Sequence, residues 1–232
     1  MPDEFLTTRW SLVVTAGGDD TVAGVALEQL CRESWRPLYA FARRWGCTPE
    51  DAEDAVQGFM ATLLARRSLA NVEAGRGKFR SFLLAGMRNH LSDEKSRATA
   101  GKRGGGAAHV SLEAEAEEGY TALAVDAETP ERAFERVWAM DVMARSRRAL
   151  GEECSASGKA AVFAAMFPDA GEAPENYAAM GERLGMSEQA LRSLAMRLRR
   201  RWRELIRAEL AQSVSSIEAL DEEMAALRAA LV

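Results

Sequence analysis

Apolar residues recur along this chain at spacings of three and four, which is the pattern of amphipathic α-helices. No run alternates apolar and polar residues as a half-buried strand would. We therefore predict an all-α protein. The expected helices cover residues 7–16, 21–45, 48–67, 79–97, 131–150, 160–167, 177–184, 188–207 and 217–232. Pro37 is expected to interrupt or kink the second of these helices.

Two segments on either side of Gly185 carry the strongest functional signal. Gly185 suits the left-handed residue that ends a helix, and Ser187 is a good N-cap for the helix that follows. The second segment has an apolar stripe formed by Leu191, Leu194, Leu198, Trp202 and Leu205. Many arginines lie outside this stripe. A short helix, a glycine turn and a longer basic helix are typical of a helix-turn-helix that enters the DNA major groove. A helical hairpin with a solvated arginine-rich face is the alternative for this stretch taken alone.

A polar, acidic stretch separates two helical regions. Residues 107–129 contain several Glu and Asp residues but no Lys or Arg, and such a segment buries too little to fold alone. We expect a domain over residues 1–106, a flexible linker over 107–129, a second domain over 130–212 and a helical tail over 213–232. The tail has a narrow apolar seam at Ile217, Leu220, Met224, Leu227 and Leu231, with Glu223 among the residues outside it. A helix this short needs a partner. We expect it to pack on the second domain, with the first domain or another protein as alternatives.

Composition restricts the functions that this chain can have. The net charge of −5 excludes a uniformly basic coat but not a local basic footprint. Cys31, Cys47 and Cys154 form no CxxC or Cys/His cluster, so we expect no metal and no cofactor, and we interpret them as buried residues in a reducing cytoplasm. No nucleophile–base pair, carboxylate dyad or phosphate loop indicates an enzyme. Neither a signal peptide nor a bilayer-spanning apolar run is visible, which predicts a cytoplasmic protein without a membrane partner.

Three motifs resemble parts of one known family. DAEDAVQGFMATLL (residues 51–64) resembles the region 2 helix by which sigma-70-type factors bind core RNA polymerase. FRSFLLAGMRNHLSDEKSR (residues 79–97) resembles the segment that opens the minus-ten element. YAAMGERLGMSEQALRSLAMRLRRRWREL (residues 177–205) resembles region 4, which reads the minus-thirty-five element. Their order and spacing, without the extra domain found between them in other members, resemble an extracytoplasmic-function (ECF) sigma factor over roughly residues 26–207.

The resemblance implies a transcription initiation factor whose partners are promoter DNA and the beta-prime and beta subunits of core RNA polymerase. It leaves open an anti-sigma factor as a further partner. The polymerase-binding face would comprise Asp51, Glu53, Asp54 and Gln57. The minus-ten contacts would comprise Arg80, Arg88, Asn89, Lys95, Arg97, Lys102 and Arg103. The minus-thirty-five contacts would comprise Ser187, Gln189, Arg192, Ser193, Met196, Arg197 and Arg200.

Two positions depart from the family pattern. Gly58 stands where an acid is expected in the polymerase-binding helix, and Met60 stands where an aromatic residue is usual. A glycine within a helix costs about 1 kcal/mol relative to alanine, so these departures bear on polymerase affinity rather than on the fold. Two other functions remain open at this point, namely a stand-alone helix-turn-helix regulator of duplex DNA and a helical protein-binding scaffold or anti-regulator.

Overall fold

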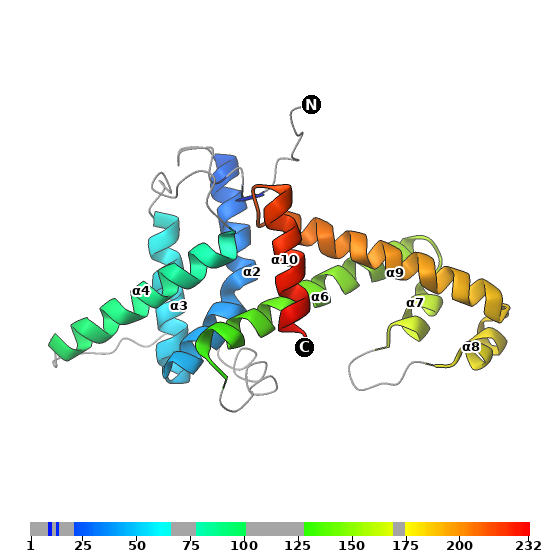
Figure 1. The fold of residues 1–232 in the computed structure, drawn as a ribbon, viewed down its shortest axis with the longest axis horizontal. Helices are drawn as coiled ribbons and strands as arrows, with labels where there is room; N and C mark the ends of the chain where they lie inside the picture. The colour runs from blue at the N-terminus through cyan, green and yellow to red at the C-terminus, as the bar shows by residue number, and fades with distance from the viewer. Residues whose placement is uncertain (1–8, 11–12, 14–20, 66–77, 101–127, 169–174) are drawn as a thin grey trace. The chain divides into compact units, whose positions relative to one another are not determined.

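The computed structural model describes the chain except for residues 1–8, 11–12, 14–20, 66–77, 101–127 and 169–174, and except for the side chains of residues 97–100. The described residues form α-helices joined by turns, and none of them lies in a β-strand (Figure 1). The all-α prediction is therefore confirmed. Most of the helix expected at residues 7–16, and nearly all of the linker expected at 107–129, lie outside the described residues.

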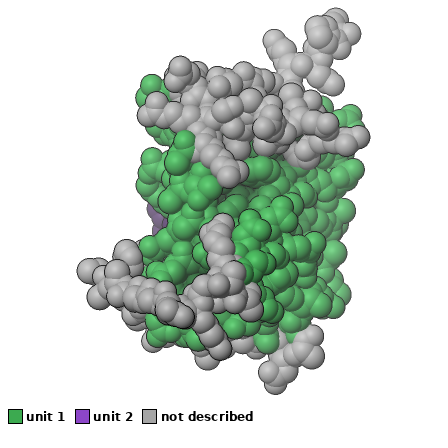
Figure 2. Space-filling view, turned by 90° about the vertical axis from the view of Figure 1, so that its left-hand side faces the viewer, with its two compact units in different colours: residues 1–140, 210–232 green, residues 141–209 purple. Residues whose placement is uncertain are grey.

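The chain divides into two compact units, which Figure 2 distinguishes by colour. Unit 1 comprises residues 1–140 and 210–232, and unit 2 comprises residues 141–209. The helices of unit 1 are α2 (Thr21–Trp45), α3 (Pro49–Ala65), α4 (Phe79–Ala100), the first part of α6 (Pro130–Ala156) and α10 (Ile217–Ala230). Unit 2 contains the rest of α6, α7 (Ala160–Met166), α8 (Tyr177–Leu184) and nearly all of α9 (Glu188–Ala211).

The C-terminal helix packs in a different place from the one we expected. α10 belongs to unit 1, with α2, α3 and α4, and not with the helices of residues 141–209. Leu220 and Leu227 of the predicted seam are buried, but so is Glu223, which the apolar pattern had placed outside the seam. The carboxylate of Glu223 pairs with Arg80 at the start of α4, and this charge pair explains the choice of partner.

The first turns of α6 also belong to unit 1 rather than to the second domain that the sequence suggested. Ala133 and Val137 are buried on one face of α6 and pack with Ala40 of α2. Thr129 caps this helix, because its side-chain Oγ1 accepts a hydrogen bond from the backbone N–H of Arg132 at 3.3 Å. The cap at Thr129 therefore determines where α6 begins, at Pro130. The apolar residues Ala133 and Val137 determine that its first turns pack in unit 1.

Pro37 does not interrupt the helix in which it lies, although an interruption was one of the two outcomes that we expected. α2 runs from Thr21 to Trp45 with Pro37 inside it. A proline within a helix costs about 3 kcal/mol, because it removes one backbone hydrogen bond and crowds the preceding turn. The five residues after Pro37 are all buried, from Leu38 to Ala42, and apolar burial on this scale offsets that cost. Gly46, with φ of +108°, ends the helix.

Helices α3 and α4 pack through two reciprocal pairs of a glycine and a ring. The ring of Phe59 lies against Gly86, where a Cβ atom would come within 2.8 Å of the ring carbon Cε2. The imidazole of His90 lies over Gly58, with its Nε2 atom 3.5 Å from the position of a Cβ there. Gly58, the first departure from the family pattern, thus lies beneath the ring of His90. Phe59 and His90 are themselves in contact, with ring centroids 5.9 Å apart.

Unit 2 has its own apolar core between α6 and α9. It is built on Leu150, Cys154, Val162, Leu194 and Leu198, with Phe163, Phe167 and Trp202 packed against them. The indole Nε1–H of Trp202 donates to Ser146 Oγ at 2.9 Å, so its one polar atom has a partner. Phe167 meets Trp202 edge-to-face at 5.4 Å. This core buries the predicted apolar stripe of α9 and leaves the opposite side of that helix exposed.

Candidate polymerase and nucleic-acid interfaces

The outer face of α3 carries part of the predicted polymerase-binding set. Asp51 and Asp54 are exposed, and Gln57 is half-buried one turn further along. Thr48 positions them, because its Oγ1 accepts a hydrogen bond from the backbone N–H of Asp51 at 3.2 Å and so caps the helix. Acidic residues in the first turn also favour the positive end of the helix dipole.

Glu53 does not lie on this face and corrects the prediction. It is only 6% exposed. Glu53 precedes the buried Val56 and Met60 by three and seven residues, so the helix turns it toward the interior. The acidic face of α3 therefore rests on Asp51 and Asp54, one turn apart.

Helix α4 presents the predicted minus-ten residues in three different situations. Asn89 and Lys95 are exposed. Arg88 is also exposed, and its Nη2 pairs with Glu131 in the first turn of α6. Burial raises the pKa of Glu131, but a bond to its own backbone and the bond from Arg88 outweigh this effect and lower the pKa overall. The side chain of Arg97, with Lys102 and Arg103, lies outside the described residues.

Arg80, the remaining member of the minus-ten set, is buried, although we had expected it to face solvent. Its residue is 8% exposed, and its Nε and Nη2 donate to the two carboxylate oxygens of Glu223 at 3.1 and 2.9 Å. Its Nη1 donates to Glu135 at 2.9 Å, and its guanidinium lies 4.5 Å from the ring centroid of Trp138. Burial disfavours the charged form of Arg80, but the bonds and charges of Glu223 and Glu135 prevail and raise its pKa. All three nitrogens of this guanidinium are therefore engaged within unit 1.

The turn between α8 and α9 has the geometry that its residues predicted. Gly185 adopts the left-handed conformation, with φ of 65° and ψ of 32°. The backbone N–H of Met186 donates to the carbonyl of Gly181 at 3.0 Å, which closes the end of α8. Ser187 Oγ accepts from the backbone N–H of Ala190 at 3.2 Å and caps α9. Asn176, which we did not single out, caps α8 in the same way.

The predicted minus-thirty-five residues share the exposed side of α9. Ser187, Gln189, Arg192, Ser193, Met196, Arg197 and Arg200 are all exposed. Met196 is 71% exposed, which is unusual for an apolar side chain and leaves it open to a partner surface. The guanidinium of Arg192 lies 5.0 Å from the ring centroid of Tyr177 and pairs with Glu188 at 3.2 Å. Tyr177 of α8 thus orients an arginine near the start of α9.

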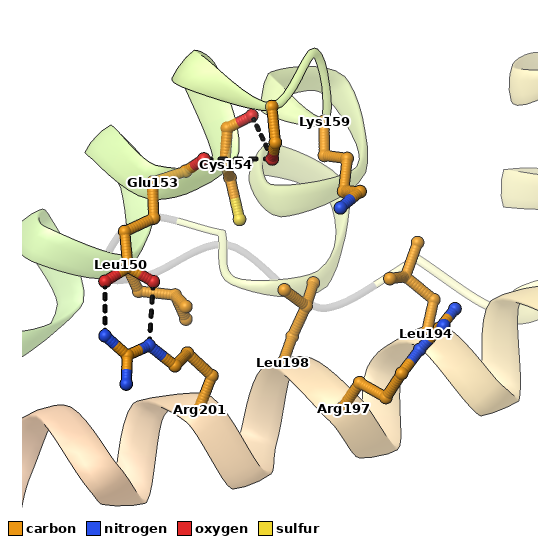
Figure 3. Close-up of a pocket in the computed structure, with 9 residues that line it drawn as sticks. Leu150, Glu153, Cys154, Lys159, Leu194, Arg197, Leu198 and Arg201 are labelled. Atoms are coloured by element: carbon orange, nitrogen blue, oxygen red, sulfur yellow. Dashed lines mark hydrogen bonds and ion pairs between the residues drawn. The ribbon is translucent and has the colours of Figure 1, made fainter.

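Two later arginines of α9 have acidic partners. Arg200 pairs with Glu204 at 3.2 Å. Arg201 makes two hydrogen bonds to Glu153 of α6, at 2.7 and 2.9 Å, and these bonds lower the pKa of the Glu153 carboxyl. Figure 3 shows this pair at the rim of a pocket of about 350 Å³ within unit 2. The same pocket is lined by Leu150, Cys154, Ser157, Lys159, Leu194, Arg197 and Leu198.

The three cysteines are free, and two of them, Cys31 and Cys154, are buried. Burial raises the pKa of the Cys31 thiol to about 12, with a smaller effect from Glu28, so it stays protonated at neutral pH. Among the residues that the structure describes, no group of three His, Cys, Asp or Glu side chains could hold a metal ion. The helices within this part of the chain are also too short or too polar to cross a membrane.

Comparison with known families identifies the region that contains α3 and α4. Residues 30–100 match the family model for sigma-70 region 2. This part of the chain is a sigma-70 region 2. It takes in the second half of α2, all of α3 and α4 as far as Ala100. No curated protein and no solved structure matches the chain.

The region 2 match supports a sigma factor role in transcription initiation, and sigma factors are non-enzymatic proteins that act with core RNA polymerase on promoter DNA. The matched residues include the acidic face of α3 and the polar positions of α4. They include neither α9 nor α10. No pattern in the sequence points directly to the acidic residues that pair with α4, which are Glu131, Glu135 and Glu223. The four-residue spacing of the first two on α6 places them on one helix face and is the one hint available.

Proposed function

We propose that this protein is an ECF-type sigma factor that binds core RNA polymerase through α3, helps to melt the minus-ten element with α4, and reads the minus-thirty-five element with α9. The observation that carries the proposal is that a region 2 match occurs in the same chain as a second, separate basic helix whose predicted DNA-reading side is exposed. A stand-alone DNA-binding regulator would have no use for the acidic face of α3. A protein-binding scaffold would have no use for a capped, arginine-rich helix with an open polar side.

In this proposal the acidic face of α3 meets a basic polymerase surface, which the family resemblance identifies as the beta-prime coiled coil. Asp51 and Asp54 are exposed and lie about one helical turn apart, so both can reach one partner surface. Gly58, one turn beyond Asp54, lies beneath the ring of His90, so the face available to a partner is the part of α3 that carries the two aspartates.

Helix α9 would read duplex DNA with the first half of its exposed side. In helix-turn-helix proteins the N-terminal residues of the second helix contact base edges, while later residues contact phosphates. Gln189 and Arg192 lie in the first two turns of α9 and Arg200 lies two turns later. Arg192 supplies bidentate hydrogen-bonding geometry suited to guanine, and the ring of Tyr177 supports it from α8.

Promoter-dependent run-off transcription with purified core polymerase tests this proposal against both alternatives, because only a sigma factor directs initiation at a promoter. We expect Asp54→Lys to weaken association with core polymerase and to lower run-off yield in proportion. Glu218→Lys makes the same charge change on the exposed side of α10 and serves as the matched control. Equal core affinity for Asp54→Lys and the wild-type protein in a pull-down experiment would remove α3 from the interface.

A further inference from the structure

Helix α10 and the residues before it lie beyond the matched region 2, yet they pack in the same unit. We propose that this C-terminal segment completes region 2, and that Glu223 is a positioning residue that holds Arg80 and the start of α4. The effect on promoter opening rests on the function proposed above. The packing of the C-terminal segment against the start of α4 rests only on contacts within unit 1.

The backbone of the C-terminal segment caps α4. The N–H of Phe79, the first residue of α4, donates to the carbonyl of Ser213 at 3.0 Å. The first N–H groups of a helix have no partner within the helix, so a carbonyl from elsewhere in the chain satisfies one of them here. The neighbouring carbonyl of Gln212 accepts from the N–H of Trp10 at 3.0 Å, and the ring of Trp10 lies 5.0 Å from that of Phe79.

Acidic side chains of α10 complement the same end of α4. Glu223 is fully buried and binds Arg80 through both carboxylate oxygens. Lys78, just before α4, pairs with Glu222 at 2.9 Å and lies 3.5 Å from Glu223. Carboxylates near a helix N-terminus are stabilised by the helix dipole as well as by their cationic partners. Glu222 and Glu223 therefore stabilise both the cations and the first turn of α4.

Because the Arg80–Glu223 ion pair is buried, we infer that α10 stays bound to the start of α4 and is not displaced. A buried carboxylate that loses its partner remains as an uncompensated charge, whereas an exposed pair separates at little cost. Glu223 has no exposure, and Arg80 is enclosed by Glu135 and Trp138 as well. Arg80 therefore serves inside region 2, and contact with the opened DNA strand is left to the exposed residues of α4, among them Arg88, Asn89 and Lys95.

A double-mutant cycle tests this inference, with Arg80→Met, Glu223→Leu and the variant that combines them. Each single change leaves a charge buried without its main partner and is expected to lower the melting temperature by about 6–20 °C. The combined change replaces the pair by apolar groups of similar size, which is often tolerated. Glu135 is partly exposed and Lys78 keeps Glu222, so neither is left as a buried, unpaired charge. Glu218→Gln, on the exposed side of the same helix, is the matched control and should change neither the melting temperature nor promoter opening.

Promoter opening in the holoenzyme, followed by permanganate reactivity of unpaired thymines, provides the functional readout. We expect opening to fall in each single variant and to return in the combined variant together with the melting temperature. Core binding is measured for every variant, so that a loss of opening is separated from a loss of association.

Three results would overturn the inference. A combined variant that is stable but does not open the promoter would show that Arg80 itself contacts DNA. Increased opening by Glu223→Leu with an unchanged melting temperature would show that α10 is a displaceable lock. Additive effects of the two changes on stability would show that Arg80 and Glu223 are not coupled. If the wild-type protein itself starts no transcription, the proposed function fails, while the stability cycle still decides the coupling.

Discussion

Replacement of Gly181 by alanine adds only a methyl group, yet we expect it to destabilise unit 2. It lies near the end of α8, and a Cβ atom there would come within 2.6 Å of the backbone oxygen of Met186. Cβ atoms essentially never approach another heavy atom within 3.0 Å. The atom in the way belongs to the backbone, so Gly181→Ala can be accommodated only by moving the turn that joins α8 to α9.

The magnitude of this effect follows from two opposing contributions. Alanine is favoured over glycine within a helix by about 1 kcal/mol. Forcing a methyl group into a filled site costs about 1–3 kcal/mol, and a clash with backbone belongs at the upper end of that range. We therefore expect Gly181→Ala to destabilise unit 2 by about 2 kcal/mol. For a unit of about 70 residues, that corresponds to a melting temperature lower by roughly 8–16 °C.

Gly24→Ala is the matched control for this change. Gly24 is exposed within α2, and a Cβ there would meet no atom within 4 Å. The helix-propensity gain should act alone, and unit 1 should gain about 1 kcal/mol. Thermal unfolding followed by circular dichroism and calorimetry would compare the two variants, which should differ by about 3 kcal/mol. The reasoning is refuted if Gly181→Ala is as stable as the wild-type protein, because the turn would then accept the methyl group at no cost.

Two further predictions concern the arginines of α9. We expect Arg192→Ala to relax base preference in the minus-thirty-five element by roughly 1–3 kcal/mol, and Arg200→Ala to weaken binding evenly across sequences with a smaller salt dependence; selection of bound sequences by each variant checks this, and a shared loss of one base preference would contradict it. The lowered pKa of Glu153 beside Arg201 should stabilise unit 2 above the unfolded pKa near 4.5 and lose that contribution as pH falls through the folded value. The difference in melting temperature between wild type and Glu153→Gln should therefore shrink below about pH 4.5, and a difference independent of pH would contradict the assignment.

Local signals in the sequence predicted the helices and their ends well. Ser187 caps the helix that it was expected to cap, Thr48 caps α3 where that helix was expected to begin, and Gly185 ends α8 in the left-handed conformation. These features depend on neighbouring residues, so spacing and side-chain chemistry are sufficient to find them. The exposed side of α9 was predicted for the same reason, because burying its apolar stripe leaves one side free.

Long-range pairing explains what the sequence did not reveal. The apolar seam of α10 was found at Leu220 and Leu227, but Glu223 lies between them and is fully buried. Helical periodicity sorts residues by polarity, so it places a carboxylate on the solvent side unless a cation is known to meet it. That cation, Arg80, is 143 residues away in the chain. The same limit applies to Glu53, whose position on α3 follows its buried neighbours rather than its charge.

Arg80 and Arg88 of α4 each pair with a carboxylate, but only one of them can exchange it for a DNA phosphate at low cost. This difference determines which arginine is available to contact DNA. Arg80 is enclosed, and freeing it would leave Glu223 charged and without water, a cost of several kcal/mol. Arg88 pairs with Glu131 in solvent, where such a pair contributes about 0–1 kcal/mol. A phosphate can replace Glu131 at almost no cost, since the arginine keeps a charge-assisted bond throughout the exchange. In the proposed function, contact with the minus-ten element should therefore be centred on Arg88 and the neighbouring Asn89, with the first turn of α4 holding these residues in place.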